Sequence, residues 1–420
     1  MQKTAIVIVI ALFFVSGCGG GGGGGSASSS ASSYDSSMTD STLLLVIAEE
    51  ISTQIAPELD EYCQSIEDRG MSCREIVWAS GTAMELREVI KSYHAQQSIA
   101  AVLMLGELPA AWYEQEAEFG SAGSFHEEFP CDIYYMSLDS QWSDQDQDGI
   151  FDGHSQLRVD LPVSRVKGEA LEIAQYLQRV LDYREGGSLV SQRAFIFKDD
   201  DWRDYRRSYD FHLSSLYSGL EIYETEAETT RDGYDSYMNH VGAEFIYQWV
   251  HSSPSTLYFQ TNEGNETLTA NEIRSRNYRA SFFNLYDCSA ARFTGENLAS
   301  TYLKTDFGLA VIGTSKTGGL YDPFYFHSSL ANGESWGAAF ATWYNREGRK
   351  DDNWFLGMCI QGCPVLRIST KTAQYLSAKT PILPPSKEDM ALLQSRAVED
   401  EASTWHEGFR DYKRQNPRFF

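Results

Sequence analysis

Basic residues are scarce in this sequence: 34 lysines and arginines stand against 59 aspartates and glutamates, and the net charge of the 420 residues is −25. A nucleic-acid partner needs a basic face, so this composition argues against one. It also argues against adsorption to anionic lipid headgroups. Paired Cys and His clusters with zinc spacing are missing as well. What remains is a chain that is 42% hydrophobic, long enough for a large core or two subdomains, with an acidic, well-solvated surface.

The N-terminal apolar run, Ala5 to Val15, is too short to span a bilayer as a mature helix. Small residues close it and lead to Cys18, a pattern that resembles a bacterial lipoprotein signal over residues 1–17, with lipidation of the Cys18 sulfur. An ordinary secretory signal is the alternative. Residues 18–41 are mostly glycine and serine, which predicts a flexible tether. We therefore expect a lipid-anchored protein of the cell envelope, in the outer membrane or at the cell surface if two membranes are present.

Apolar runs alternate with amphipathic segments after residue 41. Residues 42–47 and 99–105 are continuous apolar runs, typical of strands buried on both faces. Between them, helical spacing covers residues 55–69 and follows a capping box at 82–85, and residues 75–78 fit another strand. Strands that alternate with helices predict an α/β fold with a mostly parallel sheet.

The predicted organisation has three parts after the tether. An N-terminal α/β subdomain spans residues 42–188 and ends in an amphipathic helix. A second α/β subdomain, predicted to carry the chemistry, spans residues 189–370. Its first strand, at 194–197, is followed by Asp199, Asp200 and Asp201. At a strand end they could meet a ligand or a cation, but we interpret them as a solvated loop. Residues 371–420 form a polar extension without a chemical motif, expected to wrap the surface or mediate contacts.

Two apolar runs in the second subdomain end in residues that carry chemistry. Residues 282–286 are followed by Asp287-Cys288 and then by small residues, and the run from Phe245 ends at His251. Ligands bind at the carboxyl edge of open α/β sheets, where both side chains would lie. A thiol and an imidazole there are suited to act as nucleophile and base. Taken singly, a buried core cysteine and a loop histidine are the plain interpretations; together they indicate a Cys288–His251 pair.

Five cysteines remain beside Cys18 and Cys288, an odd number. The expected compartment permits disulfides, and Cys63 with Cys73 and Cys359 with Cys363 are possible pairs that sequence alone does not prove.

An acidic loop precedes these runs. Its carboxylates occupy positions one, three, five and nine of a calcium-type loop, with glycine at position six and the backbone carbonyl of position seven as a further ligand. These ligands are Asp144, Asp146, Asp148, Asp152 and Ile150. Position twelve is Ser155, not the bidentate Glu of an EF-hand. The loop predicts a structural calcium ion; a solvated acidic loop is the alternative. No motif indicates an organic cofactor.

The order of these motifs resembles the gingipain-type cysteine peptidases, a family in the same structural clan as caspases. The resemblance covers roughly residues 42–370 and is carried by short segments: Leu103 to Glu107, Asp132 to Tyr135, the acidic loop, Ser164 to Val166, the runs ending in His251 and Cys288, Ala310 to Gly313, and Gly362 to Leu366. It implies a caspase-like fold in two subdomains, and hydrolysis of protein or peptide substrates through a Cys288–His251 dyad. It also implies that backbone N–H groups of Ser252 and Cys288 form the oxyanion site.

Three positions depart from the family pattern. His251 lies in Val-His-Ser instead of Gly-His-Gly, Glu107 replaces an Asp, and Cys363 replaces a late Asp. A competing alignment puts Glu263 where the histidine belongs, which would remove the base. We prefer His251 because its apolar run is longer and its spacing to Cys288 leaves room for a loop. A non-catalytic, calcium-binding surface lipoprotein is the alternative function, and a purely structural calcium-stiffened module a third. Asp322 is a candidate for an acidic specificity pocket, although a turn residue before Pro323 is the plainer interpretation.

Overall fold

The computed structural model describes residues 41–118, 123–205, 212–262, 264–368, 386–399 and 408–420. The predicted signal and tether therefore lie outside the described residues, apart from Ser41. All described residues belong to one compact unit that spans Met38–Phe420.

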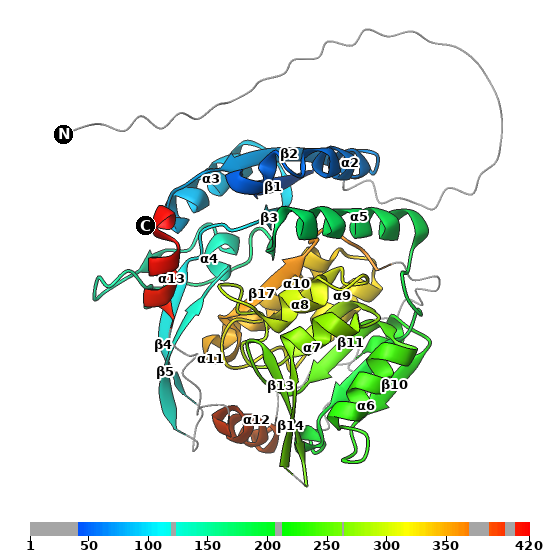
Figure 1. The fold of residues 1–420 in the computed structure, drawn as a ribbon. Helices are drawn as coiled ribbons and strands as arrows, with labels where there is room; N and C mark the ends of the chain where they lie inside the picture. The colour runs from blue at the N-terminus through cyan, green and yellow to red at the C-terminus, as the bar shows by residue number, and fades with distance from the viewer. Residues whose placement is uncertain (1–40, 119–122, 206–211, 263, 369–385, 400–407) are drawn as a thin grey trace, which may run out of the picture. The chain divides into compact units, whose positions relative to one another are not determined.

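A ten-stranded sheet forms the centre of this unit (Figure 1), in the order β10-β9-β11-β15-β16-β17-β8-β3-β1-β2. Its strand pairs are parallel except for β16 with β17. In chain order the strands are β1 Thr42–Ala48, β2 Ser72–Trp78, β3 Ile99–Leu105, β8 Val163–Val166, β9 Ala194–Lys198, β10 Leu220–Tyr223, β11 Ala243–Trp249, β15 Ala280–Tyr286, β16 Ala310–Thr314 and β17 Met358–Gly362.

The strands of the two predicted subdomains form the two halves of this sheet. The strands from residues 42–188 lie at the β2 end, those from 189–370 at the β10 end, and the halves meet where β8 pairs with β17. Seven of the strands, among them β1, β11 and β15, are buried along their whole length, as continuous apolar runs predict. The core is thus the sheet itself, covered by helices.

Helices pack against the sheet (Figure 1). α2 contacts β2 and α5, and α8 contacts β15, β16 and β17. The capping box predicted at Thr82 is present at the start of α3. The helices are α1 Glu49–Ser52, α2 Ala56–Glu67, α3 Ala83–Gln96, α4 Ile133–Met136, α5 Ala170–Gly186, α6 Arg231–Ser236, α7 Ala270–Arg276, α8 Leu298–Leu303, α9 Phe324–Ala331, α10 Trp336–Arg346, α11 Asp352–Phe355, α12 Lys387–Glu399 and α13 Phe409–Gln415.

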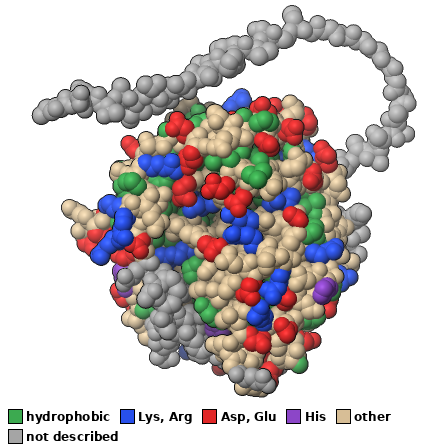
Figure 2. Space-filling view, in the orientation of Figure 1, with side chains coloured by type: hydrophobic (Ala, Val, Ile, Leu, Met, Phe, Trp, Pro, Cys, Tyr) green, Lys and Arg blue, Asp and Glu red, His purple; other side chains and the backbone are tan. Residues whose placement is uncertain are grey.

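Three smaller sheets were not predicted. β4 Trp112–Glu118 pairs with β5 Ser124–Pro130, and β6 Trp142–Ser143 pairs with β7 Gly153–His154 beside the acidic loop. β12 His251–Ser253, β13 Thr256–Thr261 and β14 Gly264–Thr269 form an antiparallel sheet directly after β11. On the face drawn in Figure 2, acidic and basic side chains are intermixed.

Candidate active site

Cys288 and His251 lie at the ends of adjacent strands. β11 and β15 are parallel neighbours, and their register pairs Trp249 with Tyr286, the last residue of each strand. His251 and Cys288 each come two residues later, so both lie beyond the carboxyl edge of the sheet. The strands stay together past their ends because the Val250 N–H donates to a carboxylate oxygen of Asp287 at 2.8 Å. The structure thus brings the predicted thiol and imidazole to one edge.

The backbone at Cys288 is held in a sharp turn. Ser252 Oγ donates to the Cys288 carbonyl at 2.7 Å, which joins the residue after the histidine to the cysteine itself. Ser289 follows with a φ of 55°, in the left-handed region that non-glycine residues seldom adopt. Cys288 is half-buried, whereas the other free cysteines among the described residues are buried. A reagent or substrate therefore has better access to Cys288 than to those thiols.

His251 is packed between an aromatic ring and a carboxylate. Its side chain is buried, and its ring lies 4.3 Å from the Trp202 ring, centroid to centroid, tilted by 31°. Its Nε2 lies 3.4 Å from a carboxylate oxygen of Asp201. A carboxylate beside an imidazole orients the ring and stabilises its protonated form. Asp201 is thus placed to orient His251.

The interpretation of Asp199 to Asp201 as a solvated loop was wrong. Asp199 is fully buried, and Asp200 and Asp201 are half-buried in the 3₁₀ turn after β9. The cause is the sheet order, because β9 is the neighbour of β11 and its end lies beside His251. Burial, together with the charge of Asp201, raises the pKa of Asp199 to about 7.

Replacing Asp199 with Asn is expected to stabilise the protein at pH 8, to stabilise it less at pH 5, and to leave its stability below pH 4 nearly unchanged. The raised pKa means that the folded chain holds the proton more tightly than the unfolded chain does. The stability that this proton contributes is present below the unfolded pKa near 4 and is lost as pH rises through about 7. Asn carries no charge, so the free energy of unfolding at pH 8 should rise by on the order of 2 kcal/mol.

Urea unfolding at these pH values measures this effect. Asp139→Asn, at an exposed position, is the matched control, and its free energy of unfolding at pH 8 should equal that of the wild type. An equal gain at pH 5 and pH 8 for Asp199→Asn would contradict the assignment of the effect to proton binding.

The structure also describes the apolar run of the competing alignment and Asp322, the candidate for an acidic specificity pocket. Residues 256–260, the apolar run of the competing alignment, lie in β13 of the small antiparallel sheet and not in the main sheet. Glu263 lies outside the described residues. Asp322 accepts the Phe324 N–H at 3.4 Å just before α9, and its carbonyl accepts the Trp343 Nε1–H at 3.1 Å. Its contacts are those of a turn residue at a helix start.

The acidic loop brings carboxylates together in two overlapping groups. Oxygens of Asp144, Asp146 and Asp148 lie within 4.8 Å of one another, and so do oxygens of Asp146, Asp152 and Glu114. Glu114 comes from β4, which pairs with the loop through the Glu114 N–H donating to the Phe151 carbonyl at 2.9 Å. Gly149, at position six, has a φ of 102°, as the sharp turn of such a loop requires. A hard dication is the ligand that this oxygen-rich set fits.

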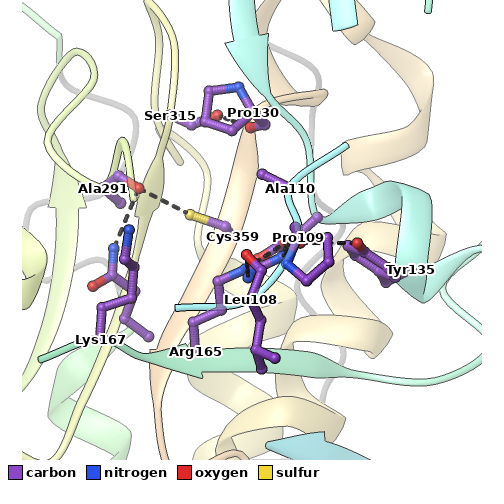
Figure 3. Close-up of polar contacts among 12 residues, drawn as sticks. Leu108, Pro109, Ala110, Pro130, Tyr135, Arg165, Lys167, Ala291, Ser315 and Cys359 are labelled. Carbon is purple, nitrogen blue, oxygen red and sulfur yellow. Dashed lines mark hydrogen bonds and ion pairs between the residues drawn. The ribbon is translucent and has the colours of Figure 1, made fainter. Parts of the chain in front are cut away.

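The early segments of the family pattern meet in one buried cluster (Figure 3). The Arg165 guanidinium binds both carboxylate oxygens of Asp132 at 2.8–3.0 Å and donates to the carbonyls of Leu108 and Pro109. It also lies 4.5 Å from the ring centre of Phe293, five residues after Cys288. The cluster therefore joins β8, the residues after β3 and the start of α4 to the segment that follows the thiol.

One of the two possible disulfides forms. Cys63 and Cys73 are bonded and link α2 to β2. Cys359 and Cys363 are both free and buried; the Cys359 thiol donates to the Ala291 carbonyl at 3.5 Å, and the Cys363 sulfur lies 3.0 Å from the Tyr62 hydroxyl.

A thiol and an imidazole at the ends of adjacent strands form the kind of nucleophile and base pair that cysteine peptidases use. The sequence matches peptidase family C25, the gingipain family, over residues 52–369, and the chain belongs to this family. The predicted family and caspase-like α/β fold are thereby confirmed.

Two solved structures share the fold. One is the complex of the pro- and mature domains of RgpB from Porphyromonas gingivalis, with a TM-score of 0.54 and 12% identity, covering 78% of this chain and 80% of that one. The other is the Arg-specific cysteine proteinase gingipain R, also with a TM-score of 0.54 and 12% identity, covering 80% and 79%. At this identity the likeness shows the fold alone. No curated protein matches the sequence.

Sequence reasoning missed two residues of these clusters. Asp201 carried a signal, since three acidic residues directly follow a predicted strand, but the sequence did not show that this strand lies beside the one that ends at His251. The sequence around Glu114 carried no such signal, because Glu114 lies beside the acidic loop only through the pairing of β4 with Phe151.

Proposed function

We propose that this protein is a membrane-anchored cysteine endopeptidase in which Cys288 is the nucleophile and His251 the base. The observation that carries the proposal is the β11–β15 register, which ends both strands at the same edge and puts the two residues at equivalent positions beyond it. Family membership supports a protein or peptide substrate.

The proposed chemistry follows from the properties of a thiol beside an imidazole. His251 takes the thiol proton, and the Cys288 thiolate attacks the peptide carbonyl to form a tetrahedral intermediate. The protonated imidazole, stabilised by Asp201, then gives its proton to the leaving amine. Water hydrolyses the remaining thioester and frees the thiol. Backbone N–H groups of Ser252 and Cys288 are proposed to bind the oxyanion; the hydrogen bond from Ser252 Oγ to the Cys288 carbonyl supports their closeness.

Incubation of the full-length protein with a mixture of peptides of diverse sequence tests this function. Mass spectrometry of the products should show internal cleavage that prior treatment with iodoacetamide prevents, and the residue before the cut defines the preference. Absence of cleavage, by folded protein with calcium present, would favour the non-catalytic surface lipoprotein.

Attachment to a membrane is proposed through a lipid on Cys18, and the support for it is the sequence pattern of residues 1–18. Within the described residues, every helix is too short or too polar to cross a bilayer. Mass spectrometry of the mature N-terminus in the membrane fraction tests the proposal: a diacylglyceryl-modified Cys18 is expected, and an unmodified N-terminus would contradict it.

Calcium is proposed to bind the acidic loop, held by Asp144, Asp146, Asp148, Asp152 and the Ile150 carbonyl, with Glu114 as an added ligand. Burial and the charge of Asp148 raise the pKa of Glu114, as expected where negative charges crowd together. When bound, the ion would screen these charges and stiffen the loop against β4.

Calcium is expected to raise the melting temperature of the protein, and Glu114→Gln should reduce that rise. Because an ion that binds only the folded state stabilises it by mass action, saturation at about 100 times Kd adds about 2.7 kcal/mol. Glu116→Gln makes the same change two residues along β4, at an exposed position outside both carboxylate groups, and should respond to calcium as the wild type does. A melting temperature that is the same in calcium and in chelator would refute the site.

A further inference from the structure

The loop that follows β16 lies against the thiol. The Gly318 N–H donates to the Cys288 sulfur over 3.5 Å, and the Ser289 N–H donates to the Lys316 carbonyl at 2.8 Å. A hydrogen bond from an amide to sulfur favours the thiolate over the thiol. Because this donor is a backbone group, its direction depends entirely on what holds the loop in place.

A buried ion pair holds this loop. Lys316 Nζ lies 2.9 Å from one carboxylate oxygen of Glu127, and both side chains are essentially inaccessible, with 0% and 1% exposure. The other oxygen of Glu127 accepts the Thr317 N–H at 3.0 Å. One carboxylate therefore binds both the Lys316 side chain and the backbone of the loop. Lys316 Nζ also donates to the carbonyls of Thr317 and Asn353, at 2.7 and 2.6 Å.

The backbone of the loop passes close to α11 at Gly318. Gly318 has a φ of 123°, and a Cβ at this position would lie 2.7 Å from the Trp354 carbonyl oxygen. A buried ion pair adds little net stability because desolvation offsets its attraction. Its effect here is geometric: it fixes β5, the loop and α11 relative to one another through directed contacts.

We propose that Lys316 and Glu127 are positioning residues for the nucleophile, which hold the loop so that the Gly318 N–H donates to the Cys288 sulfur and increases its thiolate fraction. The inference rests on the proposed function in taking Cys288 as the nucleophile. The inference goes beyond the proposed function because it assigns the stabilisation of the Cys288 thiolate to the buried Lys316–Glu127 pair and to the Gly318 N–H.

The test is the rate of alkylation of Cys288 by iodoacetamide from pH 5 to pH 10, followed by mass spectrometry of the peptide that carries Cys288. The double variant Glu127→Gln/Lys316→Met removes both charges together, so that neither is left buried alone, and Gln can still accept the Thr317 N–H. We expect its alkylation rate at pH 7 to fall about tenfold, as for loss of one hydrogen bond to a charged group. The midpoint of its pH profile should move upward.

The matched control is Glu107→Gln/Lys167→Met, the same chemical change at a pair 2.7 Å apart in the other half of the sheet. It should keep the wild-type profile. A folded Glu127→Gln/Lys316→Met protein with the wild-type profile would overturn the inference. If that variant does not fold, Glu127→Asp alone decides: it keeps both charges but shortens the carboxylate arm, so a smaller upward shift is expected, and an unchanged profile would overturn the inference. Alkylation needs no substrate, so a protein that cleaves no peptide still gives an answer, and failure of the peptidase proposal is distinguishable from failure of this one.

Discussion

Replacing Cys288 with Ala is expected to abolish peptide hydrolysis, with a loss of at least about 10⁴-fold in kcat, because loss of a covalent nucleophile removes the reaction path itself. The thiol lies at the sheet edge and not in the core, so the melting temperature should change little. His251→Ala should cause a loss of similar size, since nucleophile and base act as one unit. Initial rates on the best peptide from the mixture, together with thermal unfolding, measure both effects.

Cys131→Ala is the matched control for this prediction. Cys131 is also a free cysteine, but it is fully buried, and burial raises the pKa of its thiol, which keeps it protonated and unreactive. This variant should retain the wild-type kcat. Hydrolysis that survives in Cys288→Ala at more than a few per cent of the wild-type rate would show that another group performs the chemistry.

Replacing Arg165 with Leu is expected to lower the free energy of unfolding by about 3–5 kcal/mol, because it leaves the Asp132 carboxylate buried without its partner. The exposures of the two side chains are 2% and 0%, so water cannot replace the lost contacts. The carbonyls of Leu108 and Pro109 lose a donor as well. Equilibrium unfolding in urea measures the change.

Arg158→Leu provides the comparison for Arg165→Leu. Arg158 also pairs with an aspartate, Asp160, but its side chain is 72% exposed and the two atoms are 3.6 Å apart. Exposed pairs contribute below about 1 kcal/mol, so this variant should unfold nearly as the wild type does. Equal losses in the two variants would show that the buried cluster does not hold the fold in the way its geometry indicates.

Several strands of the central sheet could be predicted from sequence because strands that are buried on both faces are continuous apolar runs. The runs at 42–47, 99–105 and 282–286 became β1, β3 and β15 with ends shifted by at most two residues. The edge strand β10 escaped prediction because it is half-buried and short, with no continuous apolar run. Local pattern thus predicted several of the elements, while their order in the sheet is shown by the structure.

Residues brought together by that order were harder to predict. Cys288 and His251 stood out because each ends an apolar run, and their closeness follows once β11 and β15 are known to be neighbours. Asp199 looked like a surface residue because acidic triplets are usually solvated; its burial depends on β9 lying beside β11. Lys316 and Glu127 are 189 positions apart, and nothing in either local sequence indicates that they pair.

The most direct test of the dyad is labelling of the full-length protein by a library of peptide acyloxymethyl ketones in the presence of calcium. These reagents alkylate a cysteine only when the peptide binds and the thiol is activated by its base. The wild type should be labelled at Cys288 with a preference for one side chain next to the ketone, and Cys288→Ala and His251→Ala should both remain unlabelled. A folded wild type that no peptide labels, or equal labelling of His251→Ala, would contradict the assignment of Cys288 and His251 as a catalytic pair.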